Sequence, residues 1–190
     1  LRMINLIDFI VMSGRAVIYP IYYGTYERYS KDNDAPSTSR ANSEATIRIV
    51  NDCRRSIDYI EERKDIDLKK IAYYGFSFGS RIGPIVLAQE SRVSVGIFAC
   101  GGLSSRIIRS EADTYNFVTR VRIPILMVNG KYDVTFPLQY QKAMYDNLGT
   151  PAEDKKHVLL EMGHSPSPST RSQMMREILT WLDRYLGPTQ

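Results

Sequence analysis

Three polar side chains, far apart in the sequence, could together activate a nucleophile: Ser77, Asp133 and His164. Ser77 is the central residue of Gly75-Phe76-Ser77-Phe78-Gly79, a Gly-x-Ser-x-Gly motif between a predicted buried strand and a predicted helix. Small residues are expected at positions 75 and 79, because a serine on such a sharp turn crowds the residues two before and two after it. The motif therefore predicts a nucleophilic serine suited to acyl transfer.

A serine hydroxyl is a weak nucleophile at neutral pH, so it needs a base within hydrogen-bond reach. The chain contains two histidines, His157 and His164. His157 begins an apolar predicted strand, whereas His164 follows that strand, where ligands bind in open α/β sheets. His164 is the predicted general base, and the alternative is a solvated loop histidine.

The base in turn needs a carboxylate that holds its correct tautomer, and Asp133 is placed to supply one. Asp133 follows the apolar run 125–129, one predicted strand before His164. The alternative is an aspartate that favours the turn beside Gly130. Glu161 and Asp154 are weaker substitutes, because the first lies inside the last predicted strand and the second precedes it.

Acyl transfer also needs donors for an oxyanion, and the backbone N–H of Phe78 is expected to be one because it opens the helix after Ser77. A second donor normally comes from a loop after an earlier strand, and no such loop lies upstream of Ile4 in this chain. Loss of one donor lowers the rate by about 10²- to 10³-fold. The expectation is a weakened site even with its three polar side chains intact.

Length and composition favour one globular domain, with 190 residues of which 43% are apolar. The net charge of +4 comes from scattered basic residues, so no nucleic-acid partner is expected. No apolar run approaches the ~18 residues of a membrane helix, which favours a soluble, cytoplasmic protein without a membrane partner. Cys53 and Cys100 are predicted to be reduced core thiols, and neither a metal site nor a cofactor is expected.

Strands and helices alternate along the chain, which predicts an α/β fold with a mostly parallel sheet. The predicted helices cover residues 4–12, 43–63, 81–89, 138–148 and 171–186. The predicted strands cover residues 15–21, 68–74, 93–100, 125–129 and 157–162. The segments 22–39 and 103–121 are polar and are predicted to be irregular.

With Ser77, Asp133 and His164 in this order, the chain resembles the α/β-hydrolase superfamily, and within it the dienelactone-hydrolase and prolyl-oligopeptidase-like esterases. The resemblance covers about residues 4–186 and includes the segments 13–17, 122–124 and 181–186. The chain also resembles hydrolase modules at the carboxyl end of large bacterial multidomain proteins. The resemblance implies a serine esterase that acts on a small-molecule ester through an acyl-enzyme.

The chain departs from this superfamily before Ile4, where members carry three further strands and an oxyanion loop. One of those strands would lie between the predicted strands 15–21 and 68–74. We therefore expect a single, N-terminally incomplete α/β-hydrolase domain, and either fused upstream domains or a gap filled by another chain, for instance in a homodimer.

Aromatic side chains beside the predicted nucleophile and strand ends are candidates for a substrate pocket, with core packing as the alternative. They are Tyr22, Tyr23, Phe76 and Phe136. Arg106 and Arg109, in the segment 103–121, could attract an anionic substrate or could be solvated.

Two other functions remain open on the sequence. A peptidase of the prolyl-oligopeptidase type would usually require a substrate-gating domain, which this chain lacks. A catalytically weak interaction module within a larger protein would keep the fold without efficient turnover. The predicted activity is hydrolysis of a carboxylic ester.

Overall fold

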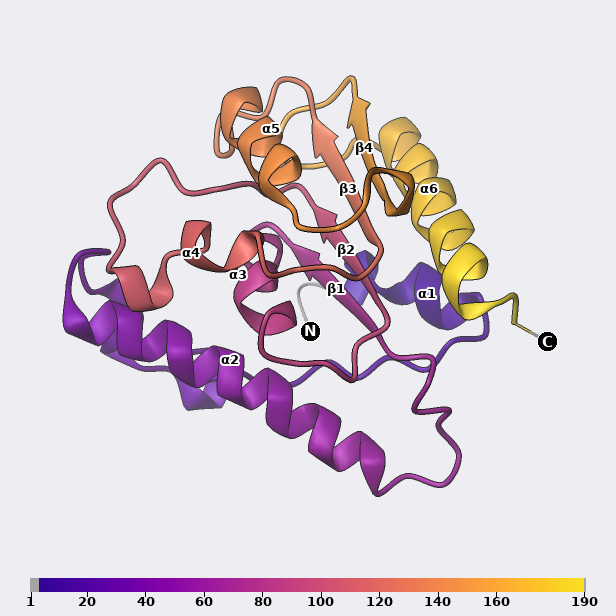
Figure 1. Ribbon diagram of the computed structural model, residues 1–190, viewed down its shortest axis with the longest axis horizontal. Coiled ribbons are helices and arrows are strands. Elements are labelled where there is room, and N and C mark those ends of the chain that lie inside the picture. Colours follow the sequence, from indigo (N-terminus) through magenta and orange to yellow (C-terminus); the bar gives the residue numbers. More distant parts are fainter. Residues whose placement is uncertain (1–3, 190) are drawn as a thin grey trace.

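The protein is described by a computed structural model that covers residues 4–189, with residue 33 described by its backbone alone. Its centre is a parallel sheet of four strands in the order β1-β2-β3-β4 (Figure 1). The strands are β1 (Ala72–Phe76), β2 (Val95–Ala99), β3 (Ile125–Gly130) and β4 (Lys155–Leu160). Helices flank both faces of this sheet, which confirms the predicted α/β class.

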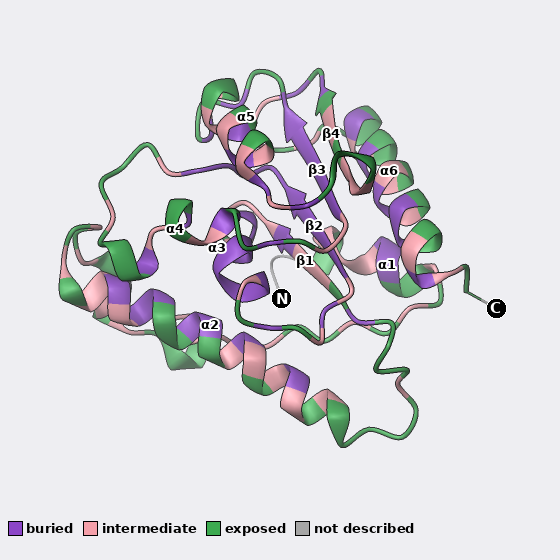
Figure 2. Ribbon diagram, in the orientation of Figure 1, coloured by how far each residue is buried: buried purple, intermediate pink, exposed green. Residues whose placement is uncertain are grey.

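The two central strands, β2 and β3, are covered on both faces. Every residue of β2 and β3 is buried, as Figure 2 shows along both arrows. A strand covered on both faces needs a continuous apolar run and not an alternating one. The sequences Val-Gly-Ile-Phe-Ala and Ile-Leu-Met-Val-Asn-Gly meet that need almost throughout. The core therefore lies on both sides of β2 and β3.

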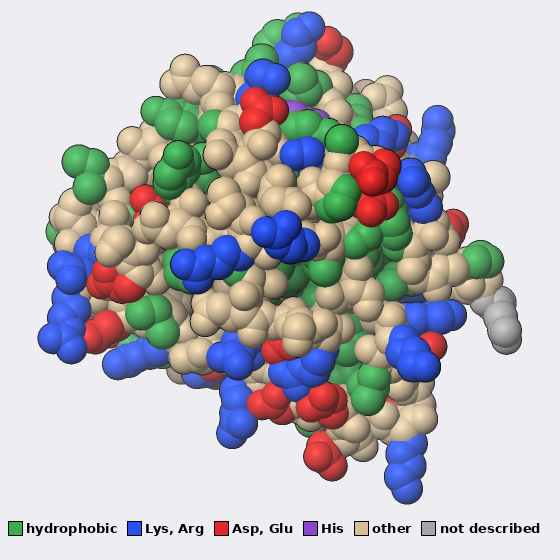
Figure 3. Space-filling view, viewed as in Figure 1, with side chains coloured by type: hydrophobic (Ala, Val, Ile, Leu, Met, Phe, Trp, Pro, Cys, Tyr) green, Lys and Arg blue, Asp and Glu red, His purple; other side chains and the backbone are tan. Residues whose placement is uncertain are grey.

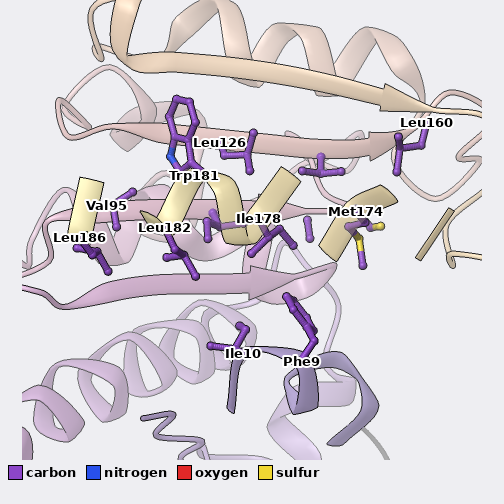
Figure 4. Close-up of a cluster of buried hydrophobic side chains, with 14 of the residues drawn as sticks. Phe9, Ile10, Val95, Leu126, Leu160, Met174, Ile178, Trp181, Leu182 and Leu186 are labelled. Atoms are coloured by element: carbon purple, nitrogen blue, oxygen red, sulfur yellow. The ribbon is translucent and has the colours of Figure 1, made fainter. Parts of the chain in front are cut away.

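One face of the sheet is covered by α1 (Asp8–Met12) and α6 (Pro168–Leu186). Figure 4 shows the buried side chains of α6, among them Ile178 and Leu182, over the strands, with Phe9 and Ile10 of α1 beside them. The other face is covered by α2 (Arg40–Glu61), α3 (Phe78–Leu87) and α5 (Leu138–Asn147). The short helix α4 (Tyr115–Val118) contacts α3 and α5.

Short 3-10 turns complete the fold, at Ile4–Leu6, Tyr26–Arg28, Lys31–Asp34, Ser110–Ala112 and Ala152–Asp154. The segment 103–121 is irregular as predicted, apart from its short turn and α4. It is held against α3 by the Thr114 hydroxyl, which donates to the Arg81 carbonyl at 2.7 Å. It also contacts α2, where the Ser43 hydroxyl lies 3.0 Å from a carboxylate oxygen of Glu111.

Three helices begin three residues earlier than predicted, and each has a serine at its N-cap. Ser39 precedes α2, Ser77 precedes α3 and Ser167 precedes α6. The side chains of Ser39 and Ser167 accept the backbone N–H groups of Asn42 and Thr170, which satisfies donors that the first helical turn leaves open. The predicted boundaries followed the apolar periodicity, which starts one turn after the cap.

The predicted strand 68–74 is displaced in the structure to Ala72–Phe76. A turn precedes β1, in which the backbone N–H of Lys70 donates to the Asp67 carbonyl at 2.9 Å. The Asp67 side chain accepts the N–H of Lys69 at 3.0 Å. Aspartate stabilises such turns through its own side chain, so the extended strand can begin only after them.

The predicted strand 15–21 is wrong: these residues form no regular secondary structure and pair with no strand of the described sheet. A β-strand is defined by hydrogen bonds to a neighbour, and no strand lies beside this segment among residues 4–189. The segment is anchored instead to α6. The Arg15 guanidinium donates to Asp183 at 2.6 Å and to the Gly187 carbonyl at 3.0 Å.

The surface mixes charges of both signs, and Figure 3 shows basic and acidic side chains interspersed on the face that it presents. Across residues 4–189 there is no helix long and apolar enough to cross a membrane. Cys53 and Cys100 are both buried and free, which confirms their placement in the core. Burial raises the pKa of the Cys53 thiol to about 11 and that of Cys100 to about 12.

Candidate active site

Ser77 occupies a strained turn between β1 and α3. Its φ of 53° and ψ of −109° are values that a residue with a side chain rarely adopts. Such a conformation costs about 1–3 kcal/mol and persists only where surrounding contacts enforce it. Here the Ser77 N–H donates to the Ala99 carbonyl at 2.8 Å, and the Ser77 carbonyl accepts the N–H of Arg81 at 2.9 Å. The turn therefore has the form predicted from the motif.

The two glycines of the motif differ in what they do. A Cβ on Gly75 would lie 2.5 Å from the carbonyl carbon of Gly79, so position 75 has no room for a side chain. A Cβ on Gly79 would meet only the Tyr73 hydroxyl, at 3.8 Å. The crowding that was expected to require a small side chain at both positions is therefore present at position 75 and not around the Cβ position of residue 79. Tyr73 instead uses its hydroxyl to donate to the Gly79 carbonyl at 2.7 Å.

The structure brings Ser77, His164 and Asp133 into one chain of hydrogen bonds. The Ser77 Oγ lies 2.8 Å from His164 Nε2, and His164 Nδ1 lies 2.9 Å from Asp133 Oδ2. A carboxylate can only accept, so the ring proton belongs on Nδ1 and donates to Asp133. Nε2 is then free to accept the proton of the Ser77 hydroxyl. This is the tautomer that general-base catalysis requires.

Both oxygens of the Asp133 carboxylate are hydrogen-bonded to protein groups. Its side chain is completely buried, and its Oδ1 accepts the backbone N–H groups of Thr135 at 2.8 Å and Phe136 at 3.0 Å. The other oxygen faces His164. Three hydrogen bonds compensate for the loss of water around the charge and fix its orientation. Glu161, the weaker candidate, is exposed and binds Lys131 and Tyr132 instead.

The loops that carry the acid and the base run close together. The backbone N–H of Lys131 donates to the Leu160 carbonyl at 2.9 Å, and that of Tyr132 donates to the Met162 carbonyl at 3.0 Å. A Cβ on Gly130 would lie 2.1 Å from the Gly163 carbonyl oxygen, so only glycine permits this approach. The spacing between Asp133 and His164 is therefore set by backbone contacts.

Two of the four aromatic pocket candidates lie at the site. The rings of Phe76 and Phe136 each stand 6.0 Å from the imidazole of His164, measured between ring centroids. Their apolar faces limit the access of water to the ring. They also restrict its rotation, so the hydrogen bonds to Ser77 and Asp133 keep their geometry.

The other two candidates are not brought to the triad. Tyr22 lines a large cavity along β1, and burial raises its pKa. The Tyr23 hydroxyl lies 2.5 Å from a carboxylate oxygen of Asp32, and the Tyr23 ring lies under the guanidinium of Arg48 at 4.7 Å. The Tyr23 side chain is thus engaged by the loop and by α2.

Of the two arginines proposed for anion binding, Arg109 forms an ion pair with Glu111 at 2.7 Å, and Arg106 is exposed.

Arg81 lies on the first turn of α3 and was not among the residues predicted from the sequence. Its guanidinium lies 4.8 Å from the centre of the exposed Phe78 ring, and its buried Nη1 has no hydrogen-bond partner among the described residues. Burial lowers the pKa of Arg81. Its position four residues after Ser77 was the available signal.

His157, the histidine not predicted to act, lies on β4 and stacks on Tyr145 with ring centroids 5.4 Å apart. Its Nε2 is buried without a hydrogen-bond partner among residues 4–189. Its pKa is lowered from 6.5 to about 4, chiefly by burial and to a smaller extent by Lys142, with Asp146 acting in the opposite direction. His157 is therefore a neutral side chain packed between β4 and α5.

We expect His157 to make the protein acid-sensitive. Because its pKa is lower in the folded state, its contribution to stability is complete above about pH 6.5 and is lost as the pH falls towards 4. The free energy of unfolding should fall by about 2–3 kcal/mol over this pH range. Urea unfolding of the wild type and His157→Phe between pH 4 and 7.5 measures it. The variant keeps the ring stack and should show a shallower decline, whereas identical pH profiles would contradict the assignment.

The chain resembles known proteins both in sequence and in fold. A scan of protein families matches residues 19–186 to the family of phospholipases and carboxylesterases. No match was found among curated protein sequences. Many solved structures match the chain, and three of them share its fold at 13–22% sequence identity.

An acetyl xylan esterase from a Paenibacillus species has a TM-score of 0.62 at 22% identity, over 75% of this chain and 54% of that one. A putative dienelactone hydrolase from Klebsiella pneumoniae has a TM-score of 0.64 at 16% identity, over 74% of this chain and 62% of that one. A putative dipeptidyl aminopeptidase IV from Bacteroides ovatus has a TM-score of 0.66 at 13% identity, over 78% of this chain and 24% of that one.

These likenesses show the α/β-hydrolase fold, and this chain spans less than two thirds of the length of each of these three proteins. The family match is broader, because it covers most of the chain, including β1 to β4 and the residues Ser77, Asp133 and His164. The chain belongs to the phospholipase/carboxylesterase family of α/β-hydrolases.

Proposed function

We propose that the protein is a serine hydrolase that cleaves carboxylic esters through an acyl-enzyme on Ser77. The observation that carries this proposal is the continuous chain of hydrogen bonds from Ser77 Oγ through the imidazole of His164 to the buried carboxylate of Asp133. Such an arrangement raises the nucleophilicity of a serine, which by itself is weak at neutral pH. Membership of the phospholipase/carboxylesterase family supports an ester as the substrate.

In the first half of the reaction, Ser77 Oγ attacks the ester carbonyl carbon while its proton passes to His164 Nε2. The Asp133 carboxylate stabilises the imidazolium that forms. The negative charge that develops on the carbonyl oxygen is placed near the N–H of Phe78, the first residue of α3. The intermediate collapses when the carbon–oxygen bond to the alcohol breaks and His164 returns the proton to the departing oxygen.

In the second half, water attacks the acyl group on Ser77. His164 Nε2 now accepts a proton from this water, and then gives it to Ser77 Oγ as the carboxylic acid departs. The rings of Phe76 and Phe136 lie against His164, and we assign them to the wall of the acyl or alcohol site. A peptidase has a similar fold and is the alternative, and the family match is what favours the ester.

A fluorophosphonate probe tests the proposal, because it reacts covalently with an activated serine. The native protein should be labelled at Ser77 and should hydrolyse 4-nitrophenyl acetate, and Ser77→Ala should do neither. Labelling is read by peptide mass spectrometry, which identifies the modified residue.

Ser80→Ala is the matched control. Ser80 lies on α3, one turn after Ser77, and its buried Oγ has no hydrogen-bond partner among the described residues. Its replacement should leave both labelling and hydrolysis unchanged. If the folded native protein neither labels nor hydrolyses the ester, the chain is an interaction module and the proposal is wrong.

A further inference from the structure

Gln141 is a polar residue at a core position of α5. Its side chain is completely buried, and so is that of Met144, three residues further along. Leu148, at the end of the helix, is buried as well, so residues 141, 144 and 148 follow the spacing of a buried helical stripe. Glutamine is mostly exposed in proteins, and apolar side chains usually fill such positions. The amide at position 141 therefore calls for a specific explanation.

Both hydrogens of the Gln141 amide bind the acid loop, which we define as residues 130–136. Nε2 donates to the Gly130 carbonyl at 2.9 Å and to the Phe136 carbonyl at 2.7 Å. Both partners are acceptors, so the nitrogen of the amide and not its oxygen must face them. Gly130 ends β3, and Phe136 lies just before α5. One side chain therefore bridges the two ends of the segment that has Asp133 at its middle.

Each end of the acid loop is itself bonded to Asp133. The Phe136 N–H donates to Asp133 Oδ1 at 3.0 Å, and the Asp133 N–H donates to the Gly130 carbonyl at 3.4 Å. The ring of Phe136 also stands 6.0 Å from the imidazole of His164. A movement of either end would therefore shift the carboxylate relative to the imidazole, whose Nδ1 lies 2.9 Å from Asp133 Oδ2.

Stability alone is a poor reason for an amide at this position. The Oε1 of Gln141 is buried and has no hydrogen-bond partner among the residues that the structure describes. An unsatisfied buried oxygen is destabilising, which offsets part of the gain from the two donated bonds. A methionine would fill a similar volume without that cost, but it could not hold the two carbonyls. The amide is therefore best explained by the geometry that it imposes on the acid loop.

We propose that Gln141 is a positioning residue for ester hydrolysis: it fixes the acid loop so that Asp133 keeps the imidazole of His164 directed at Ser77. This inference rests on the proposed function, because it adds a residue to the same site. Gln141 is completely buried, so it acts through Asp133 and not on the substrate. A displacement of about 1 Å in a catalytic group can lower a rate by on the order of 10²-fold.

Gln141→Met tests the proposal, because methionine keeps the volume of the side chain and donates no hydrogen bond. With 4-nitrophenyl acetate, kcat and kcat/KM should fall together by about tenfold or more, while KM stays within about twofold of the wild type. If the folded wild type neither hydrolyses the ester nor reacts with fluorophosphonate, the proposed function is wrong. An active wild type with an equally active Gln141→Met contradicts the role of Gln141 alone.

A spectroscopic measurement separates a misplaced Asp133 from a loss of folded protein. The proton on His164 Nδ1 gives an NMR signal at low field because of its hydrogen bond to Asp133, and its loss in Asp133→Asn assigns it. In Gln141→Met this signal should move upfield or be lost to faster exchange with water, because the bond is weakened. The measurement needs no turnover. A signal at the wild-type position in folded Gln141→Met would overturn the proposal.

Two variants of α5 are matched controls. Gln139→Met makes the same chemical change at an exposed position and should leave both kcat and the low-field signal unchanged. Met144→Ala removes a completely buried side chain from the same face of the helix. It should lower the free energy of unfolding in urea without moving the signal. If Met144→Ala moves the signal as far as Gln141→Met does, lost packing is sufficient and the proposal is wrong.

Gln141→Asn keeps the test decisive if Gln141→Met does not fold. Asparagine retains a buried amide but is shorter by one methylene group, so it should lose at least one of the two bonds to the acid loop. It should lower kcat with KM unchanged and should move the low-field signal in the same direction as Gln141→Met. Wild-type values for kcat and for the signal in folded Gln141→Asn would contradict the proposal.

Discussion

Replacing Asp133 with asparagine is expected to lower kcat for 4-nitrophenyl acetate by about 10⁴-fold. Asparagine has the shape of aspartate, so its oxygen can still accept the N–H groups of Thr135 and Phe136. Its amide nitrogen would then face His164 Nδ1 as a donor. The imidazole would have to carry its proton on Nε2, where it cannot accept the proton of Ser77. The variant should fold normally and lose the general base.

Glu161→Gln is the matched control for this prediction. Glu161 lies on the neighbouring loop but its carboxylate pairs with Lys131 at 3.0 Å and is exposed. Its neutralisation should leave kcat unchanged. Initial rates with 4-nitrophenyl acetate and the rate of fluorophosphonate labelling should fall together in Asp133→Asn. An active Asp133→Asn with an inactive Glu161→Gln would transfer the orienting role to Glu161.

The hydrogen-bonded set of Ser77, His164 and Asp133 could be predicted because its sequence signals are local. A glycine at 75 and a serine at 77 report a turn that few other residues permit, and His164 and Asp133 each follow an apolar run. The carboxyl ends of parallel strands meet at one edge, so local strand predictions were enough to bring these side chains together. The structure agrees on their hydrogen bonds, which no sequence pattern could measure.

The strand predicted at 15–21 failed for a different reason. Its apolar run is real, but a strand exists only where a neighbour supplies hydrogen bonds. Whether such a neighbour exists depends on residues far away in the sequence. The same applies to Tyr22 and Tyr23, whose tyrosine side chains suit either a pocket or a core. Their contacts with β1's cavity, Asp32 and Arg48 depend on how the loop folds back, and the residue type alone cannot decide this.

The steric need for glycine within the motif was also predicted only in part. Two glycines flank Ser77 symmetrically in the sequence, yet the chain turns so that the backbone of residue 79 comes back against residue 75. The crowding therefore falls on one of them. Gly79 lies within the first turn of α3, where a Cβ would make only an ordinary contact with the Tyr73 hydroxyl. The sequence motif alone does not distinguish positions 75 and 79, because both are glycine.

This asymmetry predicts opposite effects for two substitutions that are chemically identical. Gly75→Ala should destabilise the protein by about 3 kcal/mol or more, at the upper end for an overpacked core. The added methyl would lie 2.5 Å from the Gly79 carbonyl carbon, 2.6 Å from its oxygen and 2.7 Å from the Ser80 nitrogen. All three are backbone atoms, so no side chain can rotate away. Relief would shift α3 relative to β1 and move Ser77 from His164.

Gly79→Ala should instead be neutral or stabilising by up to about 1 kcal/mol, because alanine is the better helix former. Urea unfolding at neutral pH gives both free energies, and unchanged m-values would show that the unfolded states are comparable. Fluorophosphonate labelling of the folded fraction then separates a displaced Ser77 from simple loss of stability. Equal destabilisation by both substitutions would mean that the turn packs differently from this description, in which Gly75 lacks space for a methyl group and Gly79 does not.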